Sequence, residues 1–167
     1  MERRNAWLSY NEADEKALEK LAKDYRTFLD NGKTERECVS ELSREAEAAG
    51  YVSLDKKLAS GEKIQTGDKI YAVGMKKIMA LFHIGEDPME KGMNILGAHI
   101  DSPRLDVKQN PLYEDTDLAY LDTHYYGGVK KYHWVALPLA IHGVIVKKDG
   151  TVVNVTVGED EDDPVVY

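Results

Sequence analysis

Cysteine is nearly absent from this sequence: Cys38 is the only one, so no disulfide can form within the chain. Long apolar runs are also missing. The longest, such as residues 78–84 and 135–141, fall far short of the roughly 20 residues that a membrane-spanning helix needs. The first residues lack the apolar segment and small-residue cleavage site of a signal peptide. These absences favour a cytoplasmic protein with no membrane partner.

Positive charge is in short supply as well. The chain has 22 Lys and Arg against 30 Asp and Glu, which gives a formal net charge of −8. A nucleic-acid-binding surface needs clustered basic residues, so we expect no nucleic-acid partner. Acidic residues gather at positions 114–115 and 159–163. They predict solvated loops or a calcium site, although their spacing matches no known calcium-binding loop.

The first half of the chain carries helix signals. Hydrophobic residues make up 43% of the 167 residues, which suffices for one compact domain, or one domain and part of a second. Apolar residues recur at helical spacing over residues 17–29 and predict a helix with one buried face. Thr34 and Glu37 have the spacing of a capping box, which predicts a second helix that ends at Gly50.

Strand signals follow these helices. The predicted strands are residues 69–73, 77–84 and 93–99. The second is so uniformly apolar that we expect it to be buried on both faces. Helices followed by apolar strands predict an α/β layer fold over residues 1–104.

The character of the sequence changes beyond residue 104. Residues 118–126 and 134–141 are predicted strands, and residues 143–157 predict a β-hairpin around an Asp149-Gly150 turn. No helix of useful length is expected there. We therefore predict a separate β-rich domain over residues 105–167.

The most informative residues for function are His99 and Asp101, in the sequence Gly-Ala-His-Ile-Asp-Ser-Pro. His99 is placed at the end of a predicted strand, where α/β proteins bind ligands. A neutral imidazole is a good zinc ligand. Asp101 can hydrogen-bond the other ring nitrogen, which fixes the tautomer and makes the histidine more basic. The alternative is a core histidine whose hydrogen bonds are satisfied by a nearby carboxylate.

Three segments resemble the M18 aminopeptidases. Residues 97–108 are similar to the family's His-Thr-Asp-Ser-Pro segment and the strand after it, with Ile100 in place of the usual threonine. Residues 28–37, Phe-Leu-Asp-Asn-Gly-Lys-Thr-Glu-Arg-Glu, look like the family's N-terminal helix-turn-helix. Residues 125–128, followed by Trp134, resemble its Tyr-Gly-Gly-Gly…Trp block. The aspartyl-specific branch carries Asp-Arg after this tryptophan, whereas this chain has Ala136-Leu137, as expected of a bacterial branch with another specificity.

The resemblance implies an N-terminal portion of a zinc-dependent aminopeptidase that removes N-terminal amino acids from peptides with a metal-activated water. It implies two zinc ions in each complete subunit, although cobalt or manganese could serve. It makes His99 a metal ligand and Asp101 the residue that orients it. The general base and the other ligands are expected beyond Tyr167, so the isolated chain should be inactive. Residues 1–104 would belong to a dinuclear-zinc exopeptidase layer, and residues 105–167 would begin a β-rich inserted domain.

The same resemblance implies a homo-oligomer, with a dodecamer as the family's form. Aromatic residues at Tyr125, Tyr126, Tyr132 and Trp134 could belong to a subunit interface or to the domain's own core. Two other functions stay open. One is a non-catalytic fragment or truncated homologue that assembles with full-length subunits. The other is a relative within the wider dinuclear-zinc exopeptidase group, such as a deacylase.

Overall fold

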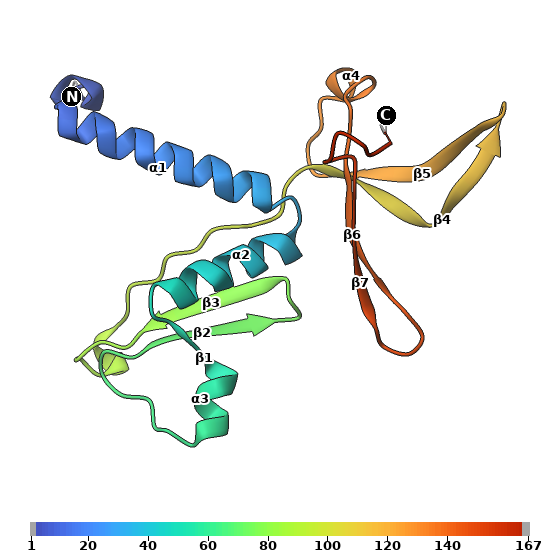
Figure 1. The fold of residues 1–167 in the computed structure, drawn as a ribbon. Helices are drawn as coiled ribbons and strands as arrows, with labels where there is room; N and C mark the ends of the chain where they lie inside the picture. The colour runs from blue at the N-terminus through green and yellow to red at the C-terminus, as the bar shows by residue number, and fades with distance from the viewer. Residues whose placement is uncertain (1–2, 165–167) are drawn as a thin grey trace. The chain divides into compact units, whose positions relative to one another are not determined.

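The computed structural model describes residues 3–164 and divides the chain into two compact units, Met1–Gly97 and Ala98–Tyr167 (Figure 1). Helices and small sheets are both present, so the predicted mixed α/β organisation is confirmed. Within the described residues, none of the helices is long and apolar enough to cross a membrane.

The first unit begins with helices whose ends follow from local hydrogen bonds. After a short 3-10 turn, Ala6–Ser9, helix α1 spans Glu12–Asn31 and α2 spans Glu35–Ala48. The predicted capping box of α2 is present. The Glu37 amide donates to Thr34 Oγ1 over 3.3 Å, and the Thr34 amide donates to Glu37 Oε2 over 2.9 Å. These bonds satisfy amides that lack a partner in the first helical turn.

A three-stranded sheet lies against α2. Strand β1 (Val52–Ser53) is parallel to β2 (Lys69–Gly74), which is antiparallel to β3 (Ile78–His83). Helix α3 (Leu54–Ser60), which the sequence analysis did not predict, connects β1 to the turn before β2, and a 3-10 turn, Met89–Lys91, follows β3. The buried residues of the unit come from α2 and β2: Cys38, Val39, Ala46, Ile70 and Tyr71. Tyr71 also donates its hydroxyl to Glu47 Oε1 over 2.8 Å, which ties the sheet to the helix.

Two predictions about burial are wrong for this chain. Helix α1 includes the predicted residues 17–29 and begins five residues earlier, but none of its residues is buried, and Leu21 on its apolar stripe is 67% exposed. Strand β3 is not buried on both faces, since Ile78 is 62% exposed and Phe82 is 49% exposed. The physical reason is similar in both cases. In the described residues of the first unit, α1 packs against α2, and β3 packs beside β2 and on one face against α2, so much of each apolar surface stays uncovered within this unit.

In its described residues, 98–164, the second unit has two β-hairpins and a single helical turn. Strands β4 (Arg104–Asp115) and β5 (Leu118–Tyr126) form the first hairpin, and β6 (Ile141–Val146) and β7 (Val152–Val157) form the second. The hairpin around Asp149-Gly150 is thus confirmed, as is the strand over 118–126. The predicted strand over 134–141 is wrong. Residues 131–134 instead form the short helix α4 (Lys131–Trp134), and Pro138, which cannot donate to a ladder, lies before β6.

The division between the units falls at Gly97 and Ala98, earlier than the predicted change at residues 104 and 105. Residues 98–103 join the second unit because they contact its first hairpin. The Tyr126 hydroxyl at the end of β5 bonds to Asp101, and Gly127 lies against Pro103. The hairpin therefore holds the segment that carries His99.

Candidate metal centre

His99 lies in an irregular segment immediately before β4. The predicted strand over 93–99 does not form, because no described strand pairs with these residues, and Leu96 is 99% exposed. His99 is therefore not at a strand end, contrary to the prediction. Its position is set instead by the hydrogen bonds of its own ring.

The His99 imidazole is fixed by Asp101. Its Nδ1 atom is 3.0 Å from the Asp101 main-chain oxygen and 3.2 Å from Asp101 Oδ1. The main-chain oxygen can only accept a hydrogen bond, and the same is true of Oδ1 when the carboxyl is ionised. Nδ1 must therefore carry the proton. In the neutral ring the lone pair is then on Nε2. Because the His99 side chain is 85% exposed, this nitrogen is accessible to a metal ion.

The Asp101 carboxylate is itself held by a second residue. The Tyr126 hydroxyl donates to Asp101 Oδ2 over 2.8 Å. This bond, followed by the bond from the Asp101 amide and the nearby imidazole, lowers the pKa of the Asp101 carboxyl below its ordinary value. Asp101 is therefore ionised at neutral pH and accepts from both neighbours. This contact of Tyr126 was not predicted from the sequence, where the residue stood out as part of an aromatic cluster and of the segment that resembles the family's Tyr-Gly-Gly-Gly…Trp block.

His99, the one ligand predicted within this chain, has Asp101 beside its ring. Across residues 3–164, no group of three or more His, Cys, Asp or Glu side chains is arranged to hold a metal ion. The donor set around His99 thus fits one imidazole ligand of a zinc site. A catalytic zinc normally has three protein ligands.

The other histidines lie elsewhere. His83 is exposed on β3, so the prediction of a core residue is wrong for this chain. His142 Nε2 is 2.9 Å from Glu159 Oε1 in the second hairpin region, and the His133 ring meets Tyr132 edge-on. None of these rings shares a ligand group with His99.

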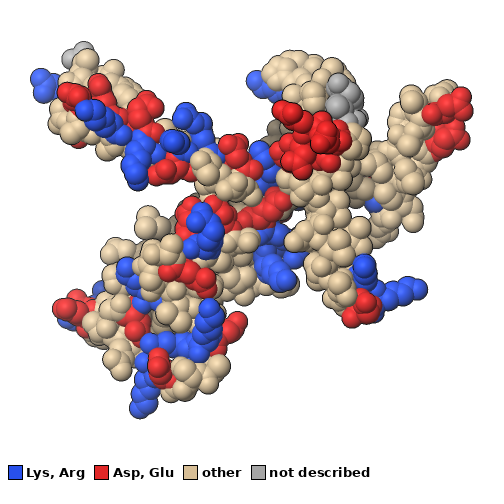
Figure 2. All heavy atoms as spheres, in the orientation of Figure 1, with Lys and Arg blue, Asp and Glu red and all other residues tan. Residues whose placement is uncertain are grey.

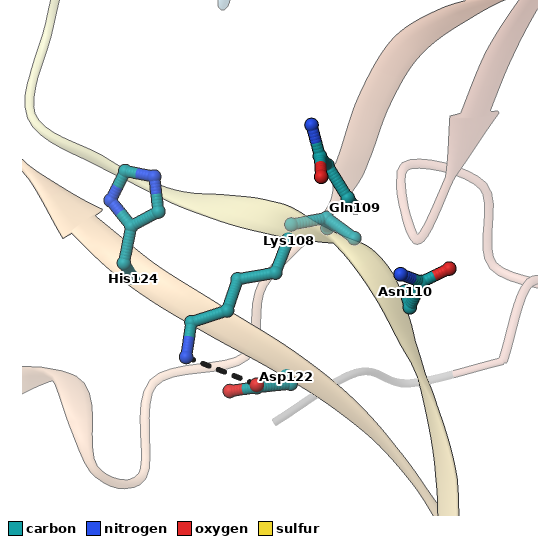
Figure 3. Close-up of a pocket in the computed structure, with 6 residues that line it drawn as sticks. Lys108, Gln109, Asn110, Asp122 and His124 are labelled. Carbon is teal, nitrogen blue, oxygen red and sulfur yellow. Dashed lines mark hydrogen bonds and ion pairs between the residues drawn. The ribbon is translucent and has the colours of Figure 1, made fainter.

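A shallow groove of about 520 Å³ lies on the β4–β5 hairpin. Here the ladder is irregular between Val107 and Leu112. Figure 3 shows Lys108 extending from β4 toward Asp122 on β5, and the Lys108 Nζ to Asp122 Oδ2 distance is 3.0 Å. All the residues lining the groove are exposed, and they are Val107, Lys108, Gln109, Asn110, Asp122 and His124. The groove is therefore an open surface and not an enclosed binding site.

Acidic side chains gather at the tip of the β4–β5 hairpin and in the segment after β7 (Figure 2). In the latter, Asp163 Oδ2 accepts from the Gly158 amide over 2.7 Å and from the Asp160 amide over 3.4 Å. These amide bonds lower the pKa of the Asp163 carboxyl. The carboxylate thus closes its own loop, which favours the solvated-loop interpretation over a calcium site.

Comparison with known proteins adds to this geometry. Residues 28–167 match the family model described as aminopeptidase I zinc metalloprotease (M18). The chain is 60% identical to a probable M18 family aminopeptidase 1 of Clostridium acetobutylicum, with 98% of this chain and 35% of that protein aligned. It is 42% identical to its namesake in Thermotoga maritima, with 99% of this chain and 35% of that protein aligned. The chain therefore spans about a third of the length of these relatives.

Solved structures give the same result. Aminopeptidase I from Borrelia burgdorferi B31 superposes with a TM-score of 0.89 at 37% identity, over 97% of this chain and 39% of that one. The M18 aminopeptidase of Thermotoga maritima gives a TM-score of 0.87 at 42% identity, over 99% of this chain and 35% of that one. Sequence and fold agree over nearly the whole chain, which belongs to the M18 family of aminopeptidase I zinc metalloproteases.

Proposed function

We propose that this chain is the N-terminal part of a zinc-dependent aminopeptidase that removes N-terminal amino acids from peptides. The observation that carries the proposal is the His99 ring. Its Nδ1 is committed to Asp101, and its Nε2 is accessible, in a chain that belongs to a family of zinc metalloproteases. This is the arrangement that a metal-binding imidazole requires.

In this proposal His99 is a metal ligand and Asp101 positions it. The bond from Nδ1 keeps the neutral tautomer in which Nε2 can bind a cation, and the negative charge of Asp101 makes the ring more basic. A zinc ion bound there would polarise the scissile carbonyl and lower the pKa of the attacking water. The remaining ligands and the general base would lie beyond Tyr167, with two zinc ions in a complete subunit. Cobalt or manganese could replace zinc.

We also propose the organisation of the complete protein. Residues 1–104 would belong to the catalytic α/β domain, and residues 105–167 would begin an inserted domain that contributes to a homo-oligomer, with a dodecamer as the expected form. The exposure of Tyr125 (55%) and Tyr132 (72%) supports an interface role for the aromatic cluster. Peptides would be the substrates, and the single cysteine is consistent with a cytoplasmic location.

The test compares His99→Ala with His83→Ala in the complete protein. His83 is an exposed histidine on β3 and serves as the matched control. We expect His99→Ala to lose one metal ion per subunit and nearly all turnover of aminoacyl reporter substrates, while His83→Ala keeps both. Metal content is measured by elemental analysis. Two metal ions per subunit in His99→Ala would exclude His99 as a ligand.

A second measurement separates the proposal from its rival. The wild-type protein should bind metal and release free amino acids only from substrates with an unblocked N-terminal amine. Stoichiometric metal without turnover would favour the non-catalytic homologue, and turnover of N-acylated substrates would favour a deacylase. Turnover by the purified 167-residue chain would show that a complete site lies within it.

A further inference from the structure

We propose that Tyr126 is a positioning residue for the metal centre: through Asp101, it holds the His99 imidazole in the orientation that binds the metal. This inference rests on the proposed role of His99 as a ligand. The sequence places the proposed site in one short segment around His99 and Asp101. Tyr126, the last residue of β5, is 25 positions along the chain from Asp101 and adds a residue to that site.

The two oxygens of Asp101 face different partners. Oδ1 is 3.2 Å from His99 Nδ1, and Oδ2 is 2.8 Å from the Tyr126 hydroxyl. An aspartate with one oxygen on the imidazole could rotate about its terminal torsion, which is broad and weakly restrained. A donor on the other oxygen restricts that rotation, so the Tyr126 bond fixes the plane in which Oδ1 meets the ring.

The Tyr126 ring is itself held. Tyr126 is the last residue of β5 and pairs with Arg104, the first residue of β4. The Arg104 guanidinium lies 4.1 Å from the centre of the Tyr126 ring, a cation–π contact. Arg104 is anchored in turn, because its Nε donates to Asp106 Oδ1 over 2.7 Å. The ring therefore lies on a regular part of the hairpin and beneath a fixed cation.

Gly127, the residue after Tyr126, has φ +75°, which L side chains rarely adopt, and a Cβ added there would lie 3.4 Å from Pro103 Cα. The chain can thus turn directly after Tyr126 and lie against the proline that follows Asp101 and Ser102. Both ends of the 101–104 segment are held by the end of β5. The start of the β-rich region and the metal-binding segment therefore form one structural unit.

The size of the effect follows from the position of Tyr126 in this chain of contacts. Loss of a residue that directly orients a metal-bound histidine costs about 10- to 100-fold in metal affinity. Tyr126 is one contact further from the metal. The Asp101 side chain is 39% exposed, so water can replace part of the lost bond. We therefore expect Tyr126→Phe to weaken zinc binding by about 3- to 10-fold, which is less than removal of the Asp101 charge.

The experiment measures zinc affinity in the complete protein by competition with a chromophoric chelator. Tyr126→Phe removes one hydroxyl and keeps the ring beneath Arg104. Tyr125→Phe is the matched control, because it removes a hydroxyl from the adjacent residue, whose ring contacts Lys131 at 4.6 Å. We expect weaker binding only in Tyr126→Phe, with circular dichroism and the thermal midpoint unchanged. Equal affinity in Tyr126→Phe and wild type would overturn the inference.

A double-mutant cycle separates positioning from a general structural effect. If Tyr126 acts through the Asp101 side chain, Tyr126→Phe should change zinc affinity by less than about twofold in an Asp101→Ala background, which lacks both of the oxygens that join Tyr126 to His99. Additive losses would mean that Tyr126 acts by another route, and would refute the inference. His99→Ala distinguishes the two levels of failure. If it keeps both metal ions, the ligand assignment fails as well; if it loses one while Tyr126→Phe binds normally, only the role of Tyr126 fails.

Discussion

The replacement of Asp101 by asparagine tests how the carboxylate contributes to the proposed metal centre. Asparagine keeps the size of the side chain and can still offer one oxygen to His99 Nδ1. Its NH₂ group then faces the Tyr126 hydroxyl, which can reverse its role and accept. The geometry should therefore survive, while the negative charge beside the imidazole is lost.

From the contacts of His99 we expect the loss of metal affinity in Asp101→Asn to lie at the lower end of the range usual for such residues. Residues that orient a metal-bound histidine are generally worth about 10- to 100-fold in metal affinity. His99 Nδ1 has two acceptors, and the shorter contact, 3.0 Å, is to the Asp101 main-chain oxygen, which no side-chain replacement removes. The main-chain contact keeps the tautomer in Asp101→Asn. We therefore expect about a tenfold loss, which corresponds to about 1.4 kcal/mol.

Zinc affinity by chelator competition, with elemental analysis of the dialysed protein, measures this loss. Asp101→Ala provides a second point. It removes both the charge and the side-chain acceptor and should bind zinc more weakly than Asp101→Asn. Loss of a whole zinc equivalent from Asp101→Asn at saturating zinc would refute the reasoning, because it would mean that the carboxylate binds the metal directly. Unchanged affinity would equally refute it, since Asp101 would then have no part in holding His99.

Three further predictions concern the stability of the complete protein. Thr34→Ala should remove the capping box of α2, cost about 1 kcal/mol and speed amide hydrogen exchange in its first turn, with unchanged exchange counting against it. Asp68 Oδ2 accepts from Lys57 Nζ at 2.8 Å, and this bond lowers the pKa of Asp68 below its ordinary 3.8. The stabilisation from this ion pair is present above the ordinary pKa and is lost as the pH falls through the lower pKa of the folded state. The urea midpoint should therefore fall less steeply with decreasing pH in Asp68→Asn than in wild type. Parallel curves for the two proteins would contradict this. Gly158→Ala, at φ +97° with its Cβ only 2.9 Å from the Leu139 carbonyl oxygen, should lower stability by about 2 kcal/mol in urea unfolding, and a neutral effect would contradict the clash.

Local signals in the sequence predicted the elements that depend on neighbouring residues. The capping box at Thr34, the hairpin around Asp149-Gly150 and the strand over 118–126 were all predicted. Each is decided within about ten residues, by turn chemistry or by hydrogen bonds to the adjacent backbone. The pairing of His99 with Asp101 belongs to the same group, because its contacts span only two positions in the sequence.

The contact between Tyr126 and Asp101 could not be predicted in this way, because a register shift in the β4–β5 hairpin determines which residues lie beside Asp101. Asp115 pairs with Leu118 around a turn in which Thr116 and Asp117 both have positive φ. Extended without interruption, that register would bring Val129 opposite Arg104. The shift between Val107 and Leu112 brings Tyr126 there instead. A bulge inserts residues into one strand and re-aims the side chains beyond it, and apolar alternation does not reveal its position. The available signals were Gly127, whose conformational freedom allows the turn, and the resemblance of residues 125–128 to a family block, neither of which names Asp101 as the partner.

The errors in predicted burial have a different cause, and they bear on the complete protein. The apolar stripe of α1 and the apolar residues of β3 have the periodicity of surfaces that pack against another layer, yet Leu21 and Ile78 are both more than 60% exposed. Scattered apolar residues on a surface need no explanation, but a helix stripe and a strand in one unit are a larger amount of apolar area than a small monomer usually exposes. The apolar periodicity of a helix or strand reflects how it is buried in the complete, functional protein. The chain spans about 35% of the relatives that it matches, so we propose that other parts of the complete protein cover α1 and β3. The same argument applies to His99, whose accessible nitrogen would be one ligand of the proposed metal site, with the other ligands supplied by the rest of the complete protein.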